Sequence, residues 1–265
     1  MKKFIIPKKP DENQILNFFK KNHLNELIEL SKNPKKRVNE MTLSSPYSPD
    51  LKDLYYLYHF IILNKRTTIL EFGSGWSSII FSLALNRLKK KYKNLVKNLR
   101  RNNPFEIFIL DNEKKFFNIS KKRTSLYKKK LKLNTKVNYL FSNVSMTTFN
   151  GRICTEYNKL PLCNPDFIYL DGPDQFNVRD NVNGINTGHK DLMPMICDIL
   201  KIENFLTPGT IIVSDGRAAN IKFLRDNFNR KWIYKNNKIS DQHILYLDDP
   251  CLGKYNKLQL EFYRQ

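Results

Sequence analysis

The sequence predicts an α/β fold built on a mostly parallel sheet. Thr67–Leu70 is a β-branched and apolar run typical of a buried strand, and an acid, two spaced glycines and a helical segment beginning at Ser77 follow it. Pro165–Leu170 is a second buried run, which ends in Asp171-Gly-Pro. Strands that alternate with helices in this way form parallel sheets with helical crossovers.

The chain of 265 residues, 41% of them hydrophobic, is long enough for one α/β domain with an appendage. We assign residues 47–265 to that domain and residues 1–46 to an N-terminal helical accessory segment. In this segment the capping-box spacing Asp11-x-x-Gln14 starts an apolar helix, which ends before Pro34, and a basic connector follows.

Cysteine usage and hydropathy indicate a soluble protein of the reducing cytoplasm. No run approaches the roughly 18 apolar residues of a membrane-spanning helix, and the opening apolar run is too short for a signal peptide. The cysteines lack the C-x-x-C spacing of a zinc site and suggest no disulfide framework. They are Cys154, Cys163, Cys197 and Cys251.

The formal net charge is +21, and most of it is concentrated in residues 87–136. This region contains 18 Lys and Arg against three acids, a net charge of +15. It either forms a solvated pair of helices or binds an anionic partner such as RNA, lipid head groups or an acidic polymer. The abundance of Lys, Asn, Ile, Phe and Tyr together is also what an A/T-rich genome would produce.

The first half of the chain contains further helices and strands. Ser48-Pro49 has the pattern of an N-cap followed by a first-turn proline. The elements expected after it are a helix at Leu51–Leu63, a basic continuation of the post-glycine helix at Arg87–Arg101, a strand at Phe105–Asp111, a helix at Glu113–Leu133 and a strand at Lys136–Phe141. Residues 143–165 show no clear periodicity.

The second half continues the alternation. The loop Gln175–Gly188 has the length and position of a substrate lid. The elements expected after it are a helix at Lys190–Phe205, a strand at Thr210–Asp215, a helix at Ala218–Phe228, strands at Lys231–Tyr234 and His243–Leu247, and a final strand at Lys257–Tyr263.

The glycine turn is the part of a βα unit that approaches a nucleotide. A phosphate-binding P-loop would need a lysine that is missing here, and a dinucleotide turn would have glycine or alanine where Ser78 stands. An ordinary tight turn is the remaining alternative to the third class, S-adenosylmethionine sites. These resemble the pattern Leu70-Glu71-x-Gly73-x-Gly75, and Glu71 favours this class.

Four motifs together resemble class I S-adenosylmethionine-dependent methyltransferases, and among them small O-methyltransferases, over roughly residues 50–263. They are Leu70–Gly75, the acid Asp111 that closes the second strand, Tyr169–Pro173 and Leu206–Asp215. The resemblance implies a Rossmann-like, doubly wound sheet of seven mostly parallel strands, with a reversed final hairpin and helices on both faces. It also implies methyl transfer to a hydroxyl of a small molecule, sugar or glycan.

The resemblance further implies a cofactor site. Glu71 would hold the methionine end, the glycines would pass under the ligand, and Asp111 would accept from the ribose hydroxyls. At the place of the adenine contact the sequence offers only Ser142 and Asn143. The expected cofactor-binding residues are Glu71, Gly73, Ser74, Gly75, Trp76, Ser77, Asp111, Ser142, Asn143 and Asp171.

A hydroxyl acceptor must lose its proton as it attacks, so the site needs a base. His189 and Asp174, on the loop after Asp171, are the candidates. Asp171 and Asp215 would orient the acceptor or hold a divalent cation such as Mg²⁺. Gly216 stands where the metal-dependent enzymes of the family have asparagine.

Arg217 is the fifth candidate catalytic residue. It would either pair with Asp171 or hold an anionic substrate. Three other functions compete with O-methylation: a nicotinamide enzyme, an RNA methyltransferase, and a non-catalytic nucleotide-binding protein with a basic surface. In the expected topology the basic helices flank the second and third strands, away from the acceptor, which favours docking or solubility over substrate recognition.

Overall fold

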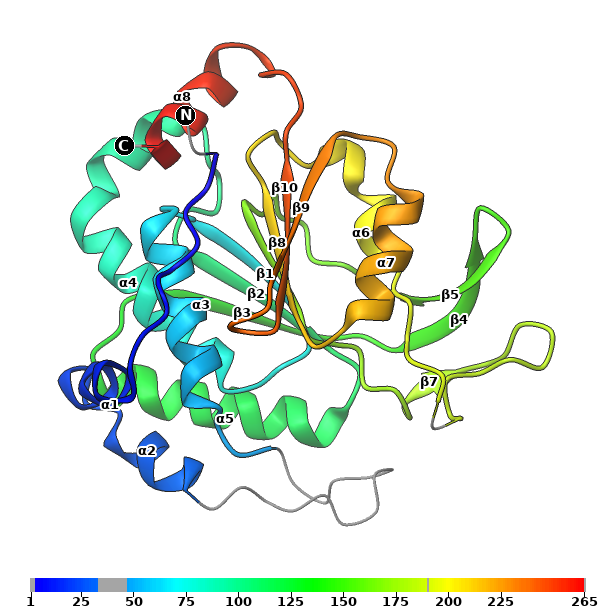
Figure 1. Cartoon of the computed structure of the whole chain (residues 1–265), viewed down its shortest axis with the longest axis horizontal. Coiled ribbons are helices and arrows are strands. Elements are labelled where there is room, and N and C mark those ends of the chain that lie inside the picture. Colours follow the sequence, from blue (N-terminus) through cyan, green and yellow to red (C-terminus); the bar gives the residue numbers. More distant parts are fainter. Residues whose placement is uncertain (1–2, 33–46, 190, 265) are drawn as a thin grey trace.

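The structure is a computed structural model that describes residues 3–32, 47–189 and 191–264 (Figure 1). Its centre is a seven-stranded sheet in which β10 runs opposite to the other six strands. The strands lie in the order β3 (Lys136–Phe141), β2 (Glu106–Asp111), β1 (Thr68–Phe72), β6 (Phe167–Leu170), β8 (Ile211–Asp215), β10 (Gln242–Leu247) and β9 (Trp232–Asn237). The predicted seven-stranded, mostly parallel sheet with a reversed final hairpin is confirmed.

Side-chain alternation along the strands builds a core on each face of the sheet. Ile69 of β1 lies in register with Ile107 of β2 and Phe167 of β6, and all three belong to one core. The next residue, Leu70, points to the opposite core and lies beside Ile168. Because both faces are covered, the central strands are continuous apolar runs, which is why they were recognisable in the sequence.

Helices cover both faces of the sheet (Figure 1). One face carries α1 (Glu12–Lys21), α2 (Asn25–Ser31), α3 (Leu51–Leu63), α4 (Ser77–Val96), α5 (Lys114–Lys130) and α8 (Gly253–Arg264). The other carries α6 (Asp198–Lys201) and α7 (Ala218–Asn227). A 3₁₀ turn at Lys97–Leu99 extends α4, and a second at Glu203–Phe205 follows α6. Within the described ranges, none of the helices combines the length and apolar character needed to cross a bilayer.

The N-terminal segment packs into the same core as the sheet. The predicted capping box is present, since the Asp11 side chain accepts from the Gln14 backbone N–H and the Gln14 side chain from that of Asp11. The sequence predicted one helix here, but the segment forms two, α1 and α2. The chain turns between them at His23, which has a positive φ of 57°. The Phe18 ring lies 4.7 Å from that of Tyr58 on α3. The expected connector at 33–46 lies outside the described residues.

The N-cap of α3 differs from the prediction. Asp50, rather than Ser48, caps the helix, and its carboxylate accepts from the backbone N–H groups of Lys52 and Asp53. Aspartate at this position satisfies two of the donors that a helix start leaves without partners.

Residues 143–165, predicted to be irregular, contain a β-hairpin. Strands β4 (Val144–Phe149) and β5 (Arg152–Tyr157) are joined by Asn150-Gly151, and both turn residues have positive φ. Asn-Gly is the strongest short hairpin signal, and the sequence analysis missed it. In the loop predicted to be a lid, β7 (Val178–Arg179) pairs with β4 and fixes that part of the loop to the hairpin.

The helix predicted at 190–205 is largely absent among its described residues. Residues 195–197 instead pair with β5: Thr155 donates to the Met195 carbonyl and accepts from Cys197 through backbone groups. Helical structure begins only at α6. Pro194 disfavours a helical conformation in the residue before it, and this signal outweighs the apolar period.

The final strand predicted at 257–263 is wrong, because this segment belongs to helix α8. Its buried positions include Asn256 and Gln259, whose side chains donate to the carbonyls of Pro208 and Leu99. Polar residues at buried helix positions concealed the helical period.

The carboxyl ends of β1 and β6 meet through two glycines. Gly73 has a φ of +95°, and a Cβ on Gly172 would lie 2.5 Å from the Gly73 nitrogen and 2.8 Å from the Phe72 carbonyl carbon. The ladder continues beside this contact, where the Asp171 N–H donates to the Phe72 carbonyl. Glycine at both positions therefore lets the two loops touch backbone to backbone.

We expect Gly172→Ala to lower the free energy of unfolding by about 1–3 kcal/mol or more, because the added methyl meets main chain that has no room to move. Gly75→Ala is the matched control: its Cβ would meet nothing closer than the Ser77 hydroxyl at 3.5 Å. Urea denaturation of both variants measures the difference. Equal stabilities would contradict the importance of this contact.

Candidate functional site

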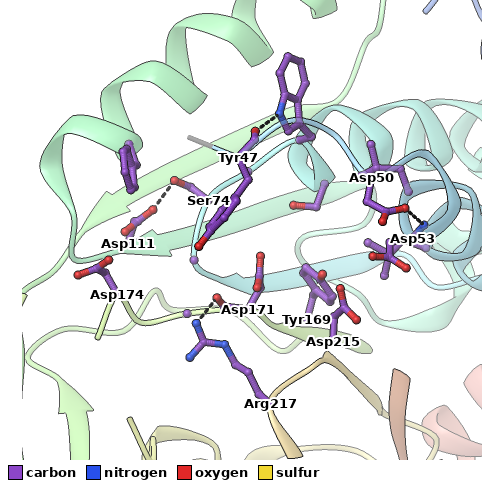
Figure 2. Close-up of a pocket in the computed structure, with 18 of the residues that line it drawn as sticks. Tyr47, Asp50, Asp53, Ser74, Asp111, Tyr169, Asp171, Asp174, Asp215 and Arg217 are labelled. Carbon is purple, nitrogen blue, oxygen red and sulfur yellow. Dashed lines mark hydrogen bonds between the residues drawn. The ribbon is translucent and has the colours of Figure 1, made fainter. Parts of the chain in front are cut away.

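A cavity of about 370 Å³ opens at the carboxyl ends of β1, β2, β6 and β8 (Figure 2). It lies where the chain order reverses, since β2 and β3 extend the sheet from one side of β1 and β6 and β8 from the other. It is lined by Tyr47, Ser48, Asp50, Asp53, Leu54, Leu57, Gly73, Ser74, Gly75, Trp76, Ser77, Asp111, Phe116, Arg123, Tyr169, Asp171, Gly172, Asp174, Asp215 and Arg217.

The glycine turn forms one wall of the cavity. All five predicted residues of the turn, from Gly73 to Ser77, line it. The N-cap residue of α4, Trp76, makes no side-chain cap hydrogen bond, and its carbonyl accepts from the Ile79 N–H at 3.2 Å. A Cβ on Gly75 would make only an ordinary contact, 3.5 Å from the Ser77 hydroxyl, so the backbone at Gly75 is not crowded by the protein.

Asp111 reaches the cavity from the end of β2, as predicted. One carboxylate oxygen accepts from the Ser74 hydroxyl (Figure 2), and the other accepts from the Glu113 backbone N–H at 2.9 Å. Burial raises the pKa of Asp111 to about 6, although both hydrogen bonds act in the opposite direction. The Asn112 backbone N–H is a third donor to this carboxylate, which leaves about one of its roughly four acceptor sites for a ligand.

Glu71 lies behind the cavity wall instead of in the cavity. It is fully buried on the face of β1 that packs against α4, and it accepts hydrogen bonds from the Ser77 and Ser78 hydroxyls. Burial raises its pKa to about 8, against the effect of these bonds. The predicted methionine-binding acid therefore joins the end of β1 to the first turn of α4 and acts on the site through Ser77.

A second wall combines the predicted Trp76 with Tyr47 and Arg123, which the sequence analysis did not select. The Trp76 indole N–H donates to the Tyr47 carbonyl at 2.9 Å, and the Arg123 guanidinium of α5 stacks 3.7 Å from the Trp76 ring centre. The Tyr47 side chain points into the cavity above Asp171 (Figure 2). These contacts place aromatic surface beside the glycine turn.

The opposite side of the cavity is acidic. Asp53, on α3, is hydrogen-bonded to Asp215 at the end of β8, and the two carboxyl groups lie together in Figure 2. Burial raises the pKa of both, and repulsion by Asp215 and Asp50 raises that of Asp53 further. Two carboxyl groups form such a bond only when they share a proton, which Asp53 donates.

Asp171 and Tyr169 complete this acidic side. Desolvation raises the pKa of the Asp171 carboxyl group, and the positive charge of nearby Arg217 partly offsets this shift. The Tyr169 pKa is raised by burial and then by Asp171, Asp215 and Asp53, so its hydroxyl stays protonated beside the acids. This part of the cavity contains hydrogen-bond acceptors together with a neutral phenol.

Arg217 and Asp174 line the cavity but are held by the protein. Arg217 donates to the main-chain carbonyls of Asp171, at 2.6 Å, and of Pro173 (Figure 2). The Asp174 carboxylate accepts from the backbone N–H groups of Phe176 and Asn177, both at 3.0 Å. The structure thus uses Arg217 to fix the loop after β6, and Asp174 to form a turn.

Besides Glu71, three predicted residues are not brought to the cavity. His189 has an exposed side chain whose Nδ1 accepts from the Asp191 backbone N–H at 3.2 Å. Ser142 accepts from the Lys159 N–H at 2.9 Å, and neither it nor Asn143 lines the cavity. In the part of the chain that the structure describes, no three His, Cys, Asp or Glu side chains are arranged to hold a metal ion.

Asp53 is the main site residue that sequence analysis missed. It is the one carboxylate within the apolar and aromatic helix α3. A helix packed over the ends of the strands presents such a residue to the site, so an isolated acid in this helix was the available signal. Its pairing with Asp215 depends on tertiary packing.

Comparison with models of known protein families and with curated proteins gives no match for this chain.

The buried acids predict that stability falls as the pH rises. Glu71 has a folded-state pKa of about 8, above the ordinary value of 4.5, so its contribution is complete below pH 4.5 and is lost as the pH approaches 8. Glu71→Gln should flatten this decline by up to a few kcal/mol. Urea denaturation at pH 5 and pH 8 measures it.

Glu261→Gln, on the exposed side of α8, is the control and should leave the pH dependence unchanged. A Glu71→Gln protein with the wild-type pH dependence would contradict a buried, protonated Glu71.

Proposed function

We propose that the protein is an S-adenosylmethionine-dependent methyltransferase that acts on a hydroxyl of a small molecule or sugar. The observation that carries the proposal is the position of the cavity, at the reversal of strand order, with the glycine turn on one side and Asp111 on the next strand. Open α/β sheets bind nucleotides at this point. The strand order and two-sided helix layers also support a Rossmann-like, doubly wound assignment.

The residues present suit such a cofactor. A volume of about 370 Å³ is in the range of small-molecule sites. Gly75 has no side chain and lines the cavity, so a ligand can approach its backbone, and the remaining acceptor capacity of Asp111 suits a ribose hydroxyl. Trp76 and Tyr47 supply flat surfaces nearby. The cofactor would supply a methyl group on a positively charged sulfur, which the surrounding carboxylates favour electrostatically.

Asp215 is the base that the geometry supports. Its hydrogen bond from Asp53 holds the carboxylate in place in the cavity, and its raised pKa makes it a better proton acceptor near neutral pH than an ordinary aspartate. In this reaction the acceptor hydroxyl would pass its proton to Asp215 as its oxygen takes the methyl group, and the sulfonium sulfur would leave as a neutral thioether. Asp171 and the Tyr169 hydroxyl would orient the acceptor.

The charge of the cavity limits the acceptor. Asp50, Asp53, Asp171 and Asp215 surround its acidic side, whereas the Nη2 group of Arg217 donates to main-chain carbonyls and its Nη1 is buried. An anionic acceptor would be repelled, so we infer a neutral, hydroxyl-bearing acceptor that donates hydrogen bonds. We assign no metal ion to the site. Asp215 is hydrogen-bonded to Asp53, and no three carboxylates among the described residues are arranged as metal ligands.

Cofactor binding is the first prediction of this function. Calorimetry should show binding of S-adenosylmethionine and S-adenosylhomocysteine, weakened at least about tenfold in Asp111→Asn, because a hydrogen bond to a charged group contributes roughly 1.5–3 kcal/mol. Gly75→Ala should also weaken binding while remaining folded. Asp226→Asn, on the surface, is the control. Absence of binding to folded wild-type protein would overturn the proposal.

Loss of the base should affect the reaction more than cofactor binding. In an assay of radiolabelled methyl transfer to a panel of polyols and sugars, Asp215→Asn should lower kcat by about 10²–10⁴. S-adenosylhomocysteine binding should change little. Wild-type kcat should rise with pH as Asp215 loses its proton. His189→Asn, outside the cavity, should be close to wild type, and the reverse ranking would assign the base to His189.

A further inference from the structure

A second hollow, of about 380 Å³, lies on the basic region and shares no lining residue with the cavity. It is formed by the second half of α4 and the segment between α5 and β3. Its first residue, Asn86, is nine positions beyond Ser77, or roughly 14 Å along the axis of α4. The two sites are thus separate along one helix.

The hollow is cationic. Five lysines line it, together with three asparagines and Leu95, and no carboxylate lies among these described residues. The lysines are Lys89, Lys90, Lys91, Lys93 and Lys132. Asn86 fixes the floor, since its side-chain oxygen accepts from the Asn134 backbone N–H at 2.9 Å, and Lys89 donates to the Asn134 carbonyl at 2.9 Å.

Like charges are held close together at this surface. Lys128 of α5 is half-buried, and its pKa is lowered by burial and then by repulsion from Lys89. In the described chain, none of the five lysines that line the hollow forms an ion pair with a carboxylate. An anion bound between the α4 and α5 lysines would relieve this repulsion.

We propose that the hollow binds the phosphodiester backbone of a nucleic acid. Lysines from α4 and from the segment after α5 converge on one concave volume, which suits a narrow chain of phosphates. A membrane surface would contact only the rim of a hollow. The lysines supply charge, and the lining includes no aromatic ring on which a base could stack, so recognition is by backbone charge and independent of base sequence.

The separation of the hollow from the cavity gives this surface a docking role. The nucleic acid would bind alongside the acceptor site without entering it. The inference therefore stands independently of the proposed methyl transfer, and each can fail without the other.

The test is fluorescence anisotropy with a labelled oligouridylate and oligodeoxythymidylate about a dozen nucleotides long, between about 50 and 200 mM KCl. The variant is Lys90→Gln, Lys93→Gln and Lys132→Gln combined, at exposed positions. The control loses the same charge at exposed Lys8, Lys9 and Lys238. The hollow variant should weaken binding of both oligonucleotides about tenfold or more and reduce the salt slope by about 2. The control should change affinity less than about threefold.

Equal losses in the two triple variants would show that net charge alone drives binding, and would overturn the site. Failure of the wild type to bind either oligonucleotide at low salt would also overturn it. Vesicles of phosphatidylcholine and phosphatidylserine provide the third arm. If they bind in a manner that depends on the hollow lysines while the oligonucleotides do not, the surface is a lipid site and the proposal is wrong.

Discussion

The site depends on a backbone contact between Gly73 and Gly172. Each residue lies just beyond the end of a central strand, and neither position has room for a methyl group. Their contact brings the loops after β1 and β6 together at the reversal of strand order. Asp171 follows β6 directly beside this contact, and the turn into α4 begins from its other side. A bulkier residue at either position would separate the loops and change the cavity floor.

Burial of acids is the second constraint, and it results from where the strands end. Glu71 and Asp111 close neighbouring strands, and Asp215 meets Asp53 from a helix packed above. Each has a raised pKa because the protein removes water around it. Serine hydroxyls stabilise Glu71 and Asp111, whereas Asp53 and Asp215 share a proton. The cavity therefore combines acceptors of hydrogen bonds with a carboxylate suited to proton transfer.

The sequence was sufficient for features set by local patterns. Buried strands ending in an acid located Asp111, Asp171 and Asp215 at one edge of the sheet. Strand periodicity also contained information that we did not use, because Glu71 shares the face of Ile69 and so points towards α4. Contacts between distant segments could not be predicted from local patterns. They include the pairing of Asp53 with Asp215 and the extended pairing of residues 195–197 with β5, which replaces the expected helix. Asn150-Gly151 and Pro194 were local signals that the apolar pattern obscured.

The most direct measurement is a crystal structure of the protein grown with S-adenosylhomocysteine. The account predicts the ribose hydroxyls within hydrogen-bond distance, about 2.6–3.2 Å, of the Asp111 carboxylate, with the amino-acid end against the Gly73–Ser77 turn and the sulfur facing Asp171 and Asp215. A ligand bound away from this cavity, or a cavity that stays empty at saturating ligand, would contradict it.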